Sequence, residues 1–304
     1  MTNKTVDIFG VPCDLGANIR GANMGPAALR IAGLDDKIRT IGYEVCDHGD
    51  IAVPVRDALS TEIKEEKYLS TIADICVELA DSCYESVMKG NIPLMIGGDH
   101  SVAIGSISGV AKKYKKKNED IGVIWVDAHG DINTPQSSES GNIHGMPVAT
   151  LLGDGHSSLV NIAYDGPKLK AENVTLIALR DIDHIEKEML KKSGVNYYTM
   201  RDIDEKGMST VMKEAIEQTS KNTAGIHLSF DIDSIDPVFA PGVSTPVPGG
   251  LNFREAHLLL EMLAETDKMT SLDFVELNPF TDQGPTSAYL TVDLILSALG
   301  KSIV

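Results

Sequence analysis

The stretch GVIWVDAHGD, residues 122–131, determines the fold class more clearly than any other part of the chain. It opens with an uncharged, mostly apolar run and then places Asp127, His129 and Asp131 where that run ends. A short apolar run bounded by polar residues is typical of a strand buried on both faces of a parallel sheet. The stretch therefore predicts a buried strand whose carboxyl end carries side chains able to bind metal.

The same pattern recurs along the whole chain. With this one, strands are predicted at 5–12, 92–98, 121–128, 173–179, 225–232 and 270–277, with weaker candidates near 43–47 and 195–199. Helical patterns lie between them, near 63–89, 100–117, 184–193, 206–220, 253–265 and 286–300. This alternation predicts a three-layer α/β/α fold with a mainly parallel sheet of roughly eight strands. No linker divides the chain, so residues 1–304 are expected to form a single domain.

Composition narrows the class of partner. The formal net charge of -17 argues against binding to nucleic acid or to an anionic membrane, because both need a basic surface. No apolar run reaches the ~18 residues that a membrane-spanning helix requires, and the first residues lack the pattern of a secretory signal. We therefore expect a cytoplasmic protein with a small-molecule substrate, no nucleic-acid partner and no membrane partner.

Four predicted strands end in residues that can bind metal. The strand at 92–98 runs into Asp99 and His100, and the strand at 225–232 runs into Asp231 and Asp233. The strand at 270–277 ends with Glu276, and 122–131 supplies its own group. Because the carboxyl ends of parallel strands meet at one edge of the sheet, these side chains are expected to converge there.

The converging groups favour a centre with two metal ions. The ligand candidates are two imidazoles and four carboxylates, namely His100, Asp127, His129, Asp131, Asp231 and Asp233. Each would be costly near a core unless paired or coordinated. Ligands of this kind, without a thiolate, suit Mn²⁺ or a similar divalent ion better than structural zinc. Six ligands are too many for one tetrahedral site, and shared carboxylates can hold two ions close together.

Other common sites fit the sequence poorly. There is no GxGxxG after the first strand, no GxxxxGK[ST] and no HExxH. The four cysteines form no CxxC pair and are expected to be free, mostly buried thiols; they are Cys13, Cys46, Cys76 and Cys83. His227 lies inside a predicted strand and is interpreted as a core residue. His48, His156, His184 and His257 have no motif context and are expected to lie at the surface or behind the site.

Several motifs together resemble the ureohydrolase family, whose members use two manganese ions to hydrolyse guanidines to urea and an amine. The motifs are GGDHS (97–101), DAHGD (127–131), SGNIHG (140–145) and SFDIDSIDP (229–237). Within the family the chain is most similar to the arginases, on the segments NTPQSSESGNIHGMP (133–147), ALRDID (178–183), TPVPGGL (245–251) and VELNP (275–279). The resemblance runs in matching order from about residue 8 to residue 300.

The resemblance implies an arginase-like catalytic domain that converts L-arginine to L-ornithine and urea. It implies two Mn²⁺ per chain, and a hydroxide bridging them that attacks the guanidinium carbon. By similarity, one ion is held by His100, Asp127, Asp131 and Asp231, and the second by Asp127, His129, Asp231 and Asp233. Asp131 would pass the hydroxide proton to the leaving amine, His144 would be the proton shuttle, and Glu276 would pair with the guanidinium.

The same resemblance implies a site that recognises an amino acid at both of its charged ends. The donors for the α-carboxylate would be Asn133, Ser138, Ser140 and Asn142, and the acceptors for the α-ammonium Asp181 and Asp183 with Glu186 behind them. Thr245 would line the site. The chain departs from the family pattern at His184-Ile185, where many arginases have Pro-Gly, and at Ser138, where Thr is common.

The family also implies a homo-oligomer, either a trimer or a hexamer. The alternative function within the family is that of an agmatinase or another guanidino-acid ureohydrolase. Agmatine has no carboxylate, however, so a loop that binds a carboxylate would have no partner in it. A relative without catalytic activity would be expected to lack some of the metal ligands. All six ligand candidates are present in this sequence, together with His144 and Glu276. A deacetylase-like enzyme with a single zinc would not need His100 and Asp131.

Overall fold

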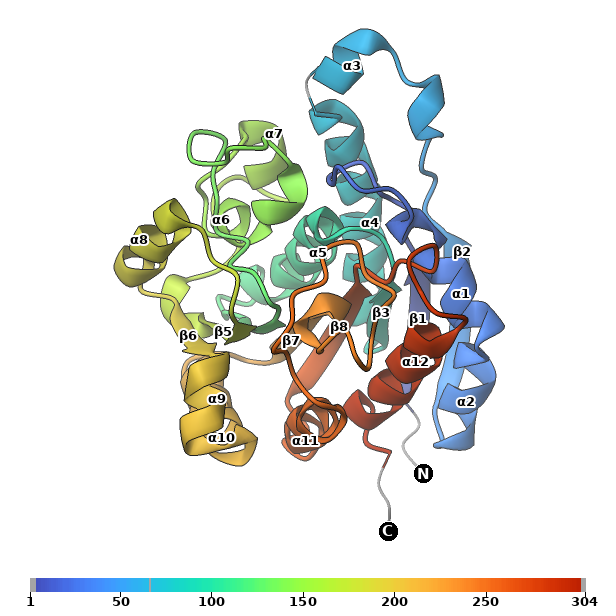
Figure 1. The fold of residues 1–304 in the computed structure, drawn as a ribbon, viewed down its shortest axis with the longest axis vertical. Helices are drawn as coiled ribbons and strands as arrows, with labels where there is room; N and C mark the ends of the chain where they lie inside the picture. The colour runs from blue at the N-terminus through green and yellow to red at the C-terminus, as the bar shows by residue number, and fades with distance from the viewer. Residues whose placement is uncertain (1–3, 66, 302–304) are drawn as a thin grey trace.

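The computed structural model describes residues 4–65 and 67–301, which are arranged around one parallel sheet of eight strands (Figure 1). The strands lie in the order β2-β1-β3-β8-β7-β4-β5-β6, and every neighbouring pair is parallel. Their bounds are β1 Thr5–Gly10, β2 Glu44–Asp50, β3 Ile92–Ile96, β4 Gly122–Val126, β5 Val174–Leu179, β6 Asn196–Thr199, β7 Ile226–Asp231 and β8 Met269–Val275. The predicted fold class is confirmed, including both weak strand candidates.

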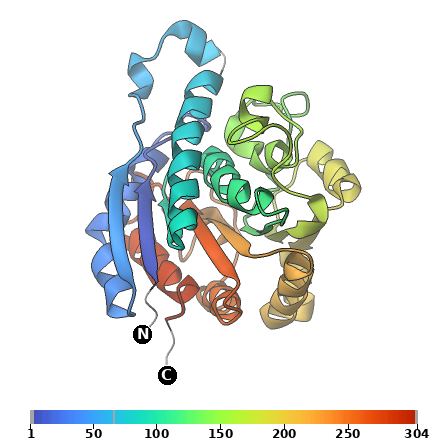
Figure 2. The same ribbon diagram turned by 180° about the vertical axis from the view of Figure 1, so that it is seen from behind.

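Helices cover both faces of the sheet and create two hydrophobic cores. On one face lie α1 (Gly25–Ile31), α2 (Leu34–Thr40), α9 (Met200–Lys206), α10 (Met208–Ser220), α11 (Phe253–Ala264) and α12 (Thr286–Ala298). The other face, seen in Figure 2, carries α4 (Leu69–Lys89) and α5 (Ala103–Lys115). The short helices α6 (Pro147–Leu151), α7 (Ser157–Val160), α8 (His184–Ser193) and α3 (Thr61–Glu65) extend this second layer. Strands buried on both faces explain the continuous apolar runs in the sequence.

Helix boundaries differ from the sequence prediction in two ways. The single helix expected over 63–89 is two helices, α3 and α4, with Tyr68 in the left-handed conformation at the start of α4. The helices α1, α2, α6, α7 and α9 were not predicted, because none has more than seven residues and each shows too few turns for a 3.6-residue period. Gly207, with φ of 80°, separates α9 from α10.

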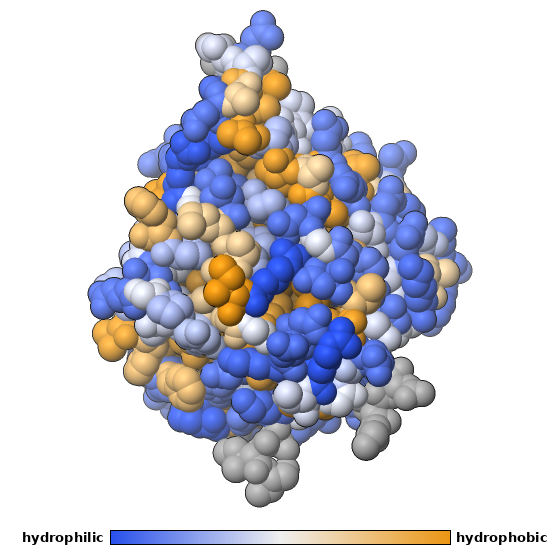
Figure 3. Space-filling model, turned by 90° about the vertical axis from the view of Figure 1, so that its right-hand side faces the viewer, coloured by the Kyte–Doolittle hydropathy of each residue, from blue (hydrophilic) through white to orange (hydrophobic). Residues whose placement is uncertain are grey.

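The surface beside the first strands has a mixed character. Figure 3 shows this side of the molecule as mostly hydrophilic, with several separate hydrophobic areas. Strand β2 forms one edge of the sheet and is largely exposed. Its charged side chains oppose pairing with a strand of another molecule. Within the described residues, no helix combines the length and the apolar character needed to cross a membrane.

Candidate metal centre and active site

The four strands with polar ends lie next to one another in the sheet, in the order β3-β8-β7-β4. Two short 3₁₀ helices, His100–Val102 after β3 and Ile232–Ser234 after β7, begin directly at the carboxyl edge. Because all strands are parallel, the polar residues after each of them reach the same edge. The predicted convergence is therefore present.

Residues with unusual backbone conformations lie where the chain reaches this edge. Gly97 and Gly98 have φ of 76° and 81°, and a β-carbon on Gly97 would lie 2.3 Å from Pro26. Only glycine fits both requirements at that position. Asp131 and Glu276 also adopt the left-handed conformation, with φ of 47° and 62°. Such conformations cost of order 1–3 kcal/mol and gather at functional sites, where the surrounding structure enforces them.

The first ligand group surrounds the ring of His100. Its Nδ1 lies 3.1 Å from an oxygen of Asp127, 3.1 Å from one of Asp231 and 3.2 Å from one of Asp131. All four side chains are buried. Neither the His100 Nδ1 nor the facing oxygen of Asp131 has a hydrogen-bond partner. Buried polar atoms without partners are rare, so this nitrogen and these oxygens point at a space that another group is built to fill.

The second ligand group surrounds the ring of His129. Its Nδ1 lies 3.1 Å from an oxygen of Asp233 and 3.3 Å from the second oxygen of Asp127. Asp127 therefore faces both histidines with different oxygens, which is how a bridging carboxylate is arranged. The donor set is nitrogen and oxygen only, which fits Mn²⁺ or a similar divalent ion. The six predicted ligands are brought together and fit two such ions.

Neighbouring side chains hold the ligands in place. The indole of Trp125 stacks on His100, with ring centroids 3.9 Å apart, and donates a hydrogen bond of 3.0 Å to Asp127. The hydroxyl of Ser229 lies 2.9 Å from the His100 Nε2, and Thr245 donates to Asp233 at 2.8 Å. Partners of this kind fix the orientation of metal ligands. Trp125 and Ser229 were not singled out from the sequence, although each lies within two residues of a ligand.

Arg180 is a further positioning residue that the sequence did not reveal. Its guanidinium donates to the backbone carbonyls of Asp233 at 2.6 Å and Ser234 at 3.0 Å. It also donates to Val247 at 2.7 Å. The side chain thereby anchors the loop that carries a ligand, and the motif ALRDID was the only signal that could have identified it.

The buried carboxylates of the cluster need nearby positive charge to remain ionised. Burial, together with the charges of Asp233 and Asp127, raises the pKa of Asp231. Burial and the charge of Asp127 also raise the pKa of Asp131. Burial and the charges of Asp131 and Asp183 raise the pKa of Glu186 to about 7. Divalent cations reverse this logic, because their charge stabilises the ionised carboxylates.

A cavity of about 170 Å³ opens onto the metal ligands. It is lined by His100, His129, Asp131, Asn133, His144, Gly145, Glu186, Asp231, Asp233, Thr245 and Glu276. Of the predicted substrate-binding residues, Asn133, Glu186 and Thr245 therefore lie in its wall. A cavity with polar groups of this kind is the usual form of a small-molecule site.

His144 and Glu276 form a pair at the wall of the cavity. One oxygen of Glu276 lies 3.1 Å from the His144 Nδ1 and accepts a hydrogen bond of 3.0 Å from the backbone N–H of His100. The other oxygen of Glu276 is buried and has no partner. Burial lowers the pKa of His144, but the hydrogen bond and charge of Glu276, with the charges of Asp99 and Asp131, raise it overall to about 9. These acidic neighbours favour the cationic form of the imidazole.

The remaining predicted substrate residues lie outside the wall of this cavity. Ser138 and Ser140 contact each other at 3.5 Å in the loop before Asn142, which is half-buried. The Asp181 carboxylate is 66% exposed and lies 3.8 Å from the His129 ring. Asp183 caps α8 by accepting from the N–H groups of residues 185 and 186, and it also accepts from the Asn133 side chain at 2.8 Å. Their predicted roles in binding stay predictions.

His227 is a core residue, as predicted. Its ring is buried and lies 2.8 Å from the Ser271 hydroxyl and 2.9 Å from the Asp273 carboxylate. The cysteines are free thiols, and three of the four are buried. The exception is Cys46, which is exposed on β2.

Comparisons with known proteins agree with this geometry. The model of the arginase family matches residues 4–300. An arginase of Brevibacillus brevis is 47% identical over 99% of this chain and 100% of its own length. The solved arginase of Bacillus caldovelox is 45% identical with a TM-score of 0.94, covering 99% of this chain and 100% of its own. The Entamoeba histolytica arginase, solved in complex with L-ornithine, is 31% identical with a TM-score of 0.90 and covers 99% of both chains.

The match to the family model extends over almost the whole chain, and the relatives align from end to end. The metal-competent groups that the sequence motifs predicted lie together at the carboxyl edge of the sheet. The chain therefore belongs to the arginase family and is a hydrolase.

Proposed function

We propose that this protein hydrolyses L-arginine to L-ornithine and urea with two Mn²⁺ ions bound at the carboxyl edge of the sheet. The observation that carries the proposal is the buried Nδ1 of His100, which faces three carboxylate oxygens at 3.1–3.2 Å and bonds to none of them. A divalent ion among these atoms would satisfy all four ligands at once. The similar Entamoeba histolytica arginase was solved with L-ornithine, the product proposed here.

We assign the ligands in two sets that share Asp127 and Asp231. One set is His100, Asp127, Asp131 and Asp231, and the other is Asp127, His129, Asp231 and Asp233. When bound there, the ions lower the pKa of water and supply a hydroxide nucleophile at neutral pH. The four aspartates compensate the charge of the ions, and Trp125, Ser229 and Thr245 keep the ligands oriented.

Glu276 would hold the guanidinium of the substrate. Its buried oxygen without a partner is an acceptor, and its second oxygen is already fixed by His100 and His144. A carboxylate anchored in this way presents a rigid acceptor to the planar guanidinium fork. Holding the fork still places its carbon next to the metal ligands, which reduces the entropy cost of reaching the transition state.

Two side chains are placed to move protons. The Asp131 carboxylate lies inside the cluster with one oxygen facing the proposed ion, so its other oxygen can accept a proton from the nucleophile. Asp131 would pass that proton to the leaving amine. His144 lies between the cavity and the solvent, with 21% of its side chain exposed. Glu276 occupies the Nδ1 of His144, so the Nε2 end of the ring is the one that can shuttle protons between the site and solvent.

The charged ends of the amino acid would be recognised at the mouth of the cavity. We assign the α-carboxylate to the loop that holds Asn133, Ser138, Ser140 and Asn142, and the α-ammonium to Asp181 and Asp183 with Glu186 behind them. The hydrogen bond of 2.8 Å between Asn133 and Asp183 supports this assignment, because it joins the two groups at the mouth. The α-carboxylate and the α-ammonium of the substrate would then be bound next to each other.

The test compares urea release from L-arginine and from agmatine, which lacks the carboxylate. With Mn²⁺ bound, we expect kcat/KM to be on the order of 10³ higher for L-arginine, since unpaired buried donors cost roughly 1–3 kcal/mol each. Chelation of the metal should abolish turnover of both substrates. Equal kcat/KM values would instead favour the alternative function, that of an agmatinase.

A further inference from the structure

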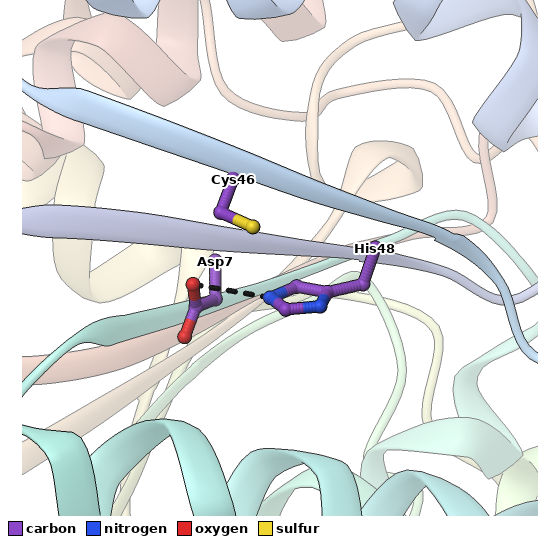
Figure 4. Close-up of side chains that lie close together, drawn as sticks. All are labelled: Asp7, Cys46 and His48. Carbon is purple, nitrogen blue, oxygen red and sulfur yellow. Dashed lines mark ion pairs between the residues drawn. The ribbon is translucent and has the colours of Figure 1, made fainter.

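A second group of metal-competent side chains lies at the far edge of the sheet from β6. Asp7 is on β1, and Cys46 and His48 are on the edge strand β2. Asp7 is the direct register partner of Cys46, and His48 follows two residues later on the same face. Figure 4 shows the three side chains on one side of the two strands, with the His48 ring turned towards Asp7.

The ligand atoms lie close enough together to reach one ion after side-chain rotation. The His48 Nε2 lies 3.1 Å from an oxygen of Asp7, and the Cys46 sulfur lies within 4.8 Å of both partners. Tetrahedral zinc with these ligands needs separations of about 3.3–3.6 Å, from its usual bond lengths. Cys46 and His48 are exposed, so an ion can enter and small side-chain rotations can close the site.

Two of the three ligands are held in place by neighbours. Asn91 donates a hydrogen bond of 3.0 Å to one oxygen of the buried Asp7, which leaves the other oxygen facing His48. Phe9 stacks on the His48 ring, with centroids 4.8 Å apart and planes 13° apart. Partners that orient carboxylate and imidazole ligands are a common feature of metal sites in proteins.

A cavity of about 200 Å³ adjoins the group, between these strands and α4. Its wall includes Asp7, His48, Glu78 and Glu85. It also includes the Ser86 hydroxyl, which is buried and has no hydrogen-bond partner. The wall carries four carboxylates, counting that of Asp50, against the single ammonium of Lys89, and this excess of negative charge favours a cation. The buried hydroxyl of Ser86, next to Asp7, is a further polar group that an ion or its water could contact.

We propose that Asp7, Cys46 and His48 bind one thiophilic divalent metal ion of the Zn²⁺ class. A thiolate, an imidazole and a carboxylate are ligands that zinc accepts together, whereas Mn²⁺ favours oxygen. The Cys46 thiol releases its proton to solvent when the ion binds. The ion joins β1 to β2, so it fixes the edge strand to the sheet. This site shares no residue with the proposed catalytic centre and does not depend on the proposed function.

Co²⁺ is the probe that separates the two centres. Coordination by a thiolate gives a charge-transfer band in the near ultraviolet, and none of the six ligands at the catalytic edge contains sulfur. Protein loaded with Mn²⁺ is titrated with Co²⁺ and then with competing Zn²⁺. We expect one equivalent of Co²⁺ to produce the band and one equivalent of Zn²⁺ to remove it.

Variants test which side chains bind the Co²⁺ ion. Cys46→Ser and His48→Gln should each abolish the band, and Asn91→Ala should weaken Co²⁺ binding about 10-fold, as for other residues that orient a ligand. The matched control His156→Gln, at a half-buried histidine outside the group, should leave it unchanged. Retained urea release by Cys46→Ser would show that the fold is intact. The absence of the band, or a band that persists in His48→Gln, would overturn the proposal.

Discussion

His144 is the residue whose role the geometry separates most clearly from metal binding. It contacts Glu276 through Nδ1, whereas the metal-facing nitrogens belong to His100 and His129. The buried aspartates Asp127 and Asp131 instead face those two rings. Substitutions should therefore distinguish a loss of proton transfer from a loss of metal binding.

We predict that His144→Asn retains the bound metal but lowers kcat by about 10- to 1000-fold, the range for a lost general acid or base. KM for L-arginine should change little, because Glu276 is the residue proposed to hold the guanidinium. Asp131→Asn is the contrasting variant and should lose metal and activity together. Metal analysis and steady-state kinetics on both proteins check this. Loss of metal from His144→Asn would identify that residue as a ligand.

Asp183 has one observed role and one proposed role, and a single substitution could affect both. It caps α8 through the N–H groups of residues 185 and 186, and it is also assigned to the α-ammonium. Asp183→Ser keeps a good cap without the charge, so we expect KM for L-arginine to rise about 10- to 100-fold at unchanged stability. Asp183→Ala should raise KM similarly and also lower the free energy of unfolding by about 1 kcal/mol. An unchanged KM in Asp183→Ser would exclude the charge from binding.

At the level of secondary structure, strands were easier to predict than helices. The strand at 122–126 reads as a continuous apolar run because both of its faces are buried, and such runs need no tertiary information. The helix α2, LDDKIRT, buries only Leu34 and Ile38. Two apolar positions do not define a helical period, so only packing against the sheet reveals this element.

The edge strand β2 is attached to α1 by Arg30. Its guanidinium donates to both oxygens of Asp47, at 2.7 and 2.9 Å, and to Asp50. Burial raises the pKa of Asp47, but the hydrogen bond and charge of Arg30 lower it below its usual value overall. A carboxyl whose folded pKa is depressed stabilises the protein above its unfolded pKa, and this stability is lost as the pH falls through the folded value.

We predict that Arg30→Gln lowers the free energy of unfolding by about 1 kcal/mol at neutral pH, the upper range for a bidentate pair near the surface. The difference from the unsubstituted protein should shrink as the pH falls below the ordinary pKa of an aspartate, about 3.9, and through the lowered pKa of Asp47. Arg201→Gln removes a single exposed pair with Glu205 and is the control, with an expected loss below about 0.5 kcal/mol. Denaturant melts at several pH values measure both. Equal losses in the two variants would contradict the role given to Arg30.

At the level of the whole molecule, the sequence predicted which residues would meet but not how they would contact one another. Strand ends located the six ligand candidates, since parallel strands share an edge. The bond between the His100 backbone and Glu276 joins residues 176 positions apart, and no local pattern encodes such a contact. The positions of Ser138, Ser140 and Asn142 outside the cavity wall depend on loop conformation, which sequence periodicity does not define. The expected trimer or hexamer and the single domain over 1–304 stay predictions.

Binding of the proposed ions should be linked to the stability of the entire fold. The ligands come from the ends of three strands, and ions that bind only the folded state stabilise it by mass action. At metal concentrations about 100 times the Kd, each ion contributes about 2.7 kcal/mol to this stabilisation. We predict that chelation lowers the thermal midpoint by about 5 °C or more. A midpoint that chelators leave unchanged would mean that the cluster holds no ion in solution.

The most direct measurement of the central claim is the manganese content of the active protein. Protein reconstituted with Mn²⁺ and freed of excess metal is analysed for manganese per chain, while urea release from L-arginine is followed in the same samples. We expect close to two Mn per chain at full activity, and a loss of activity when either ligand set is disrupted by Asp131→Asn or Asp233→Asn. Full activity at a single Mn per chain would contradict a centre that works with two ions.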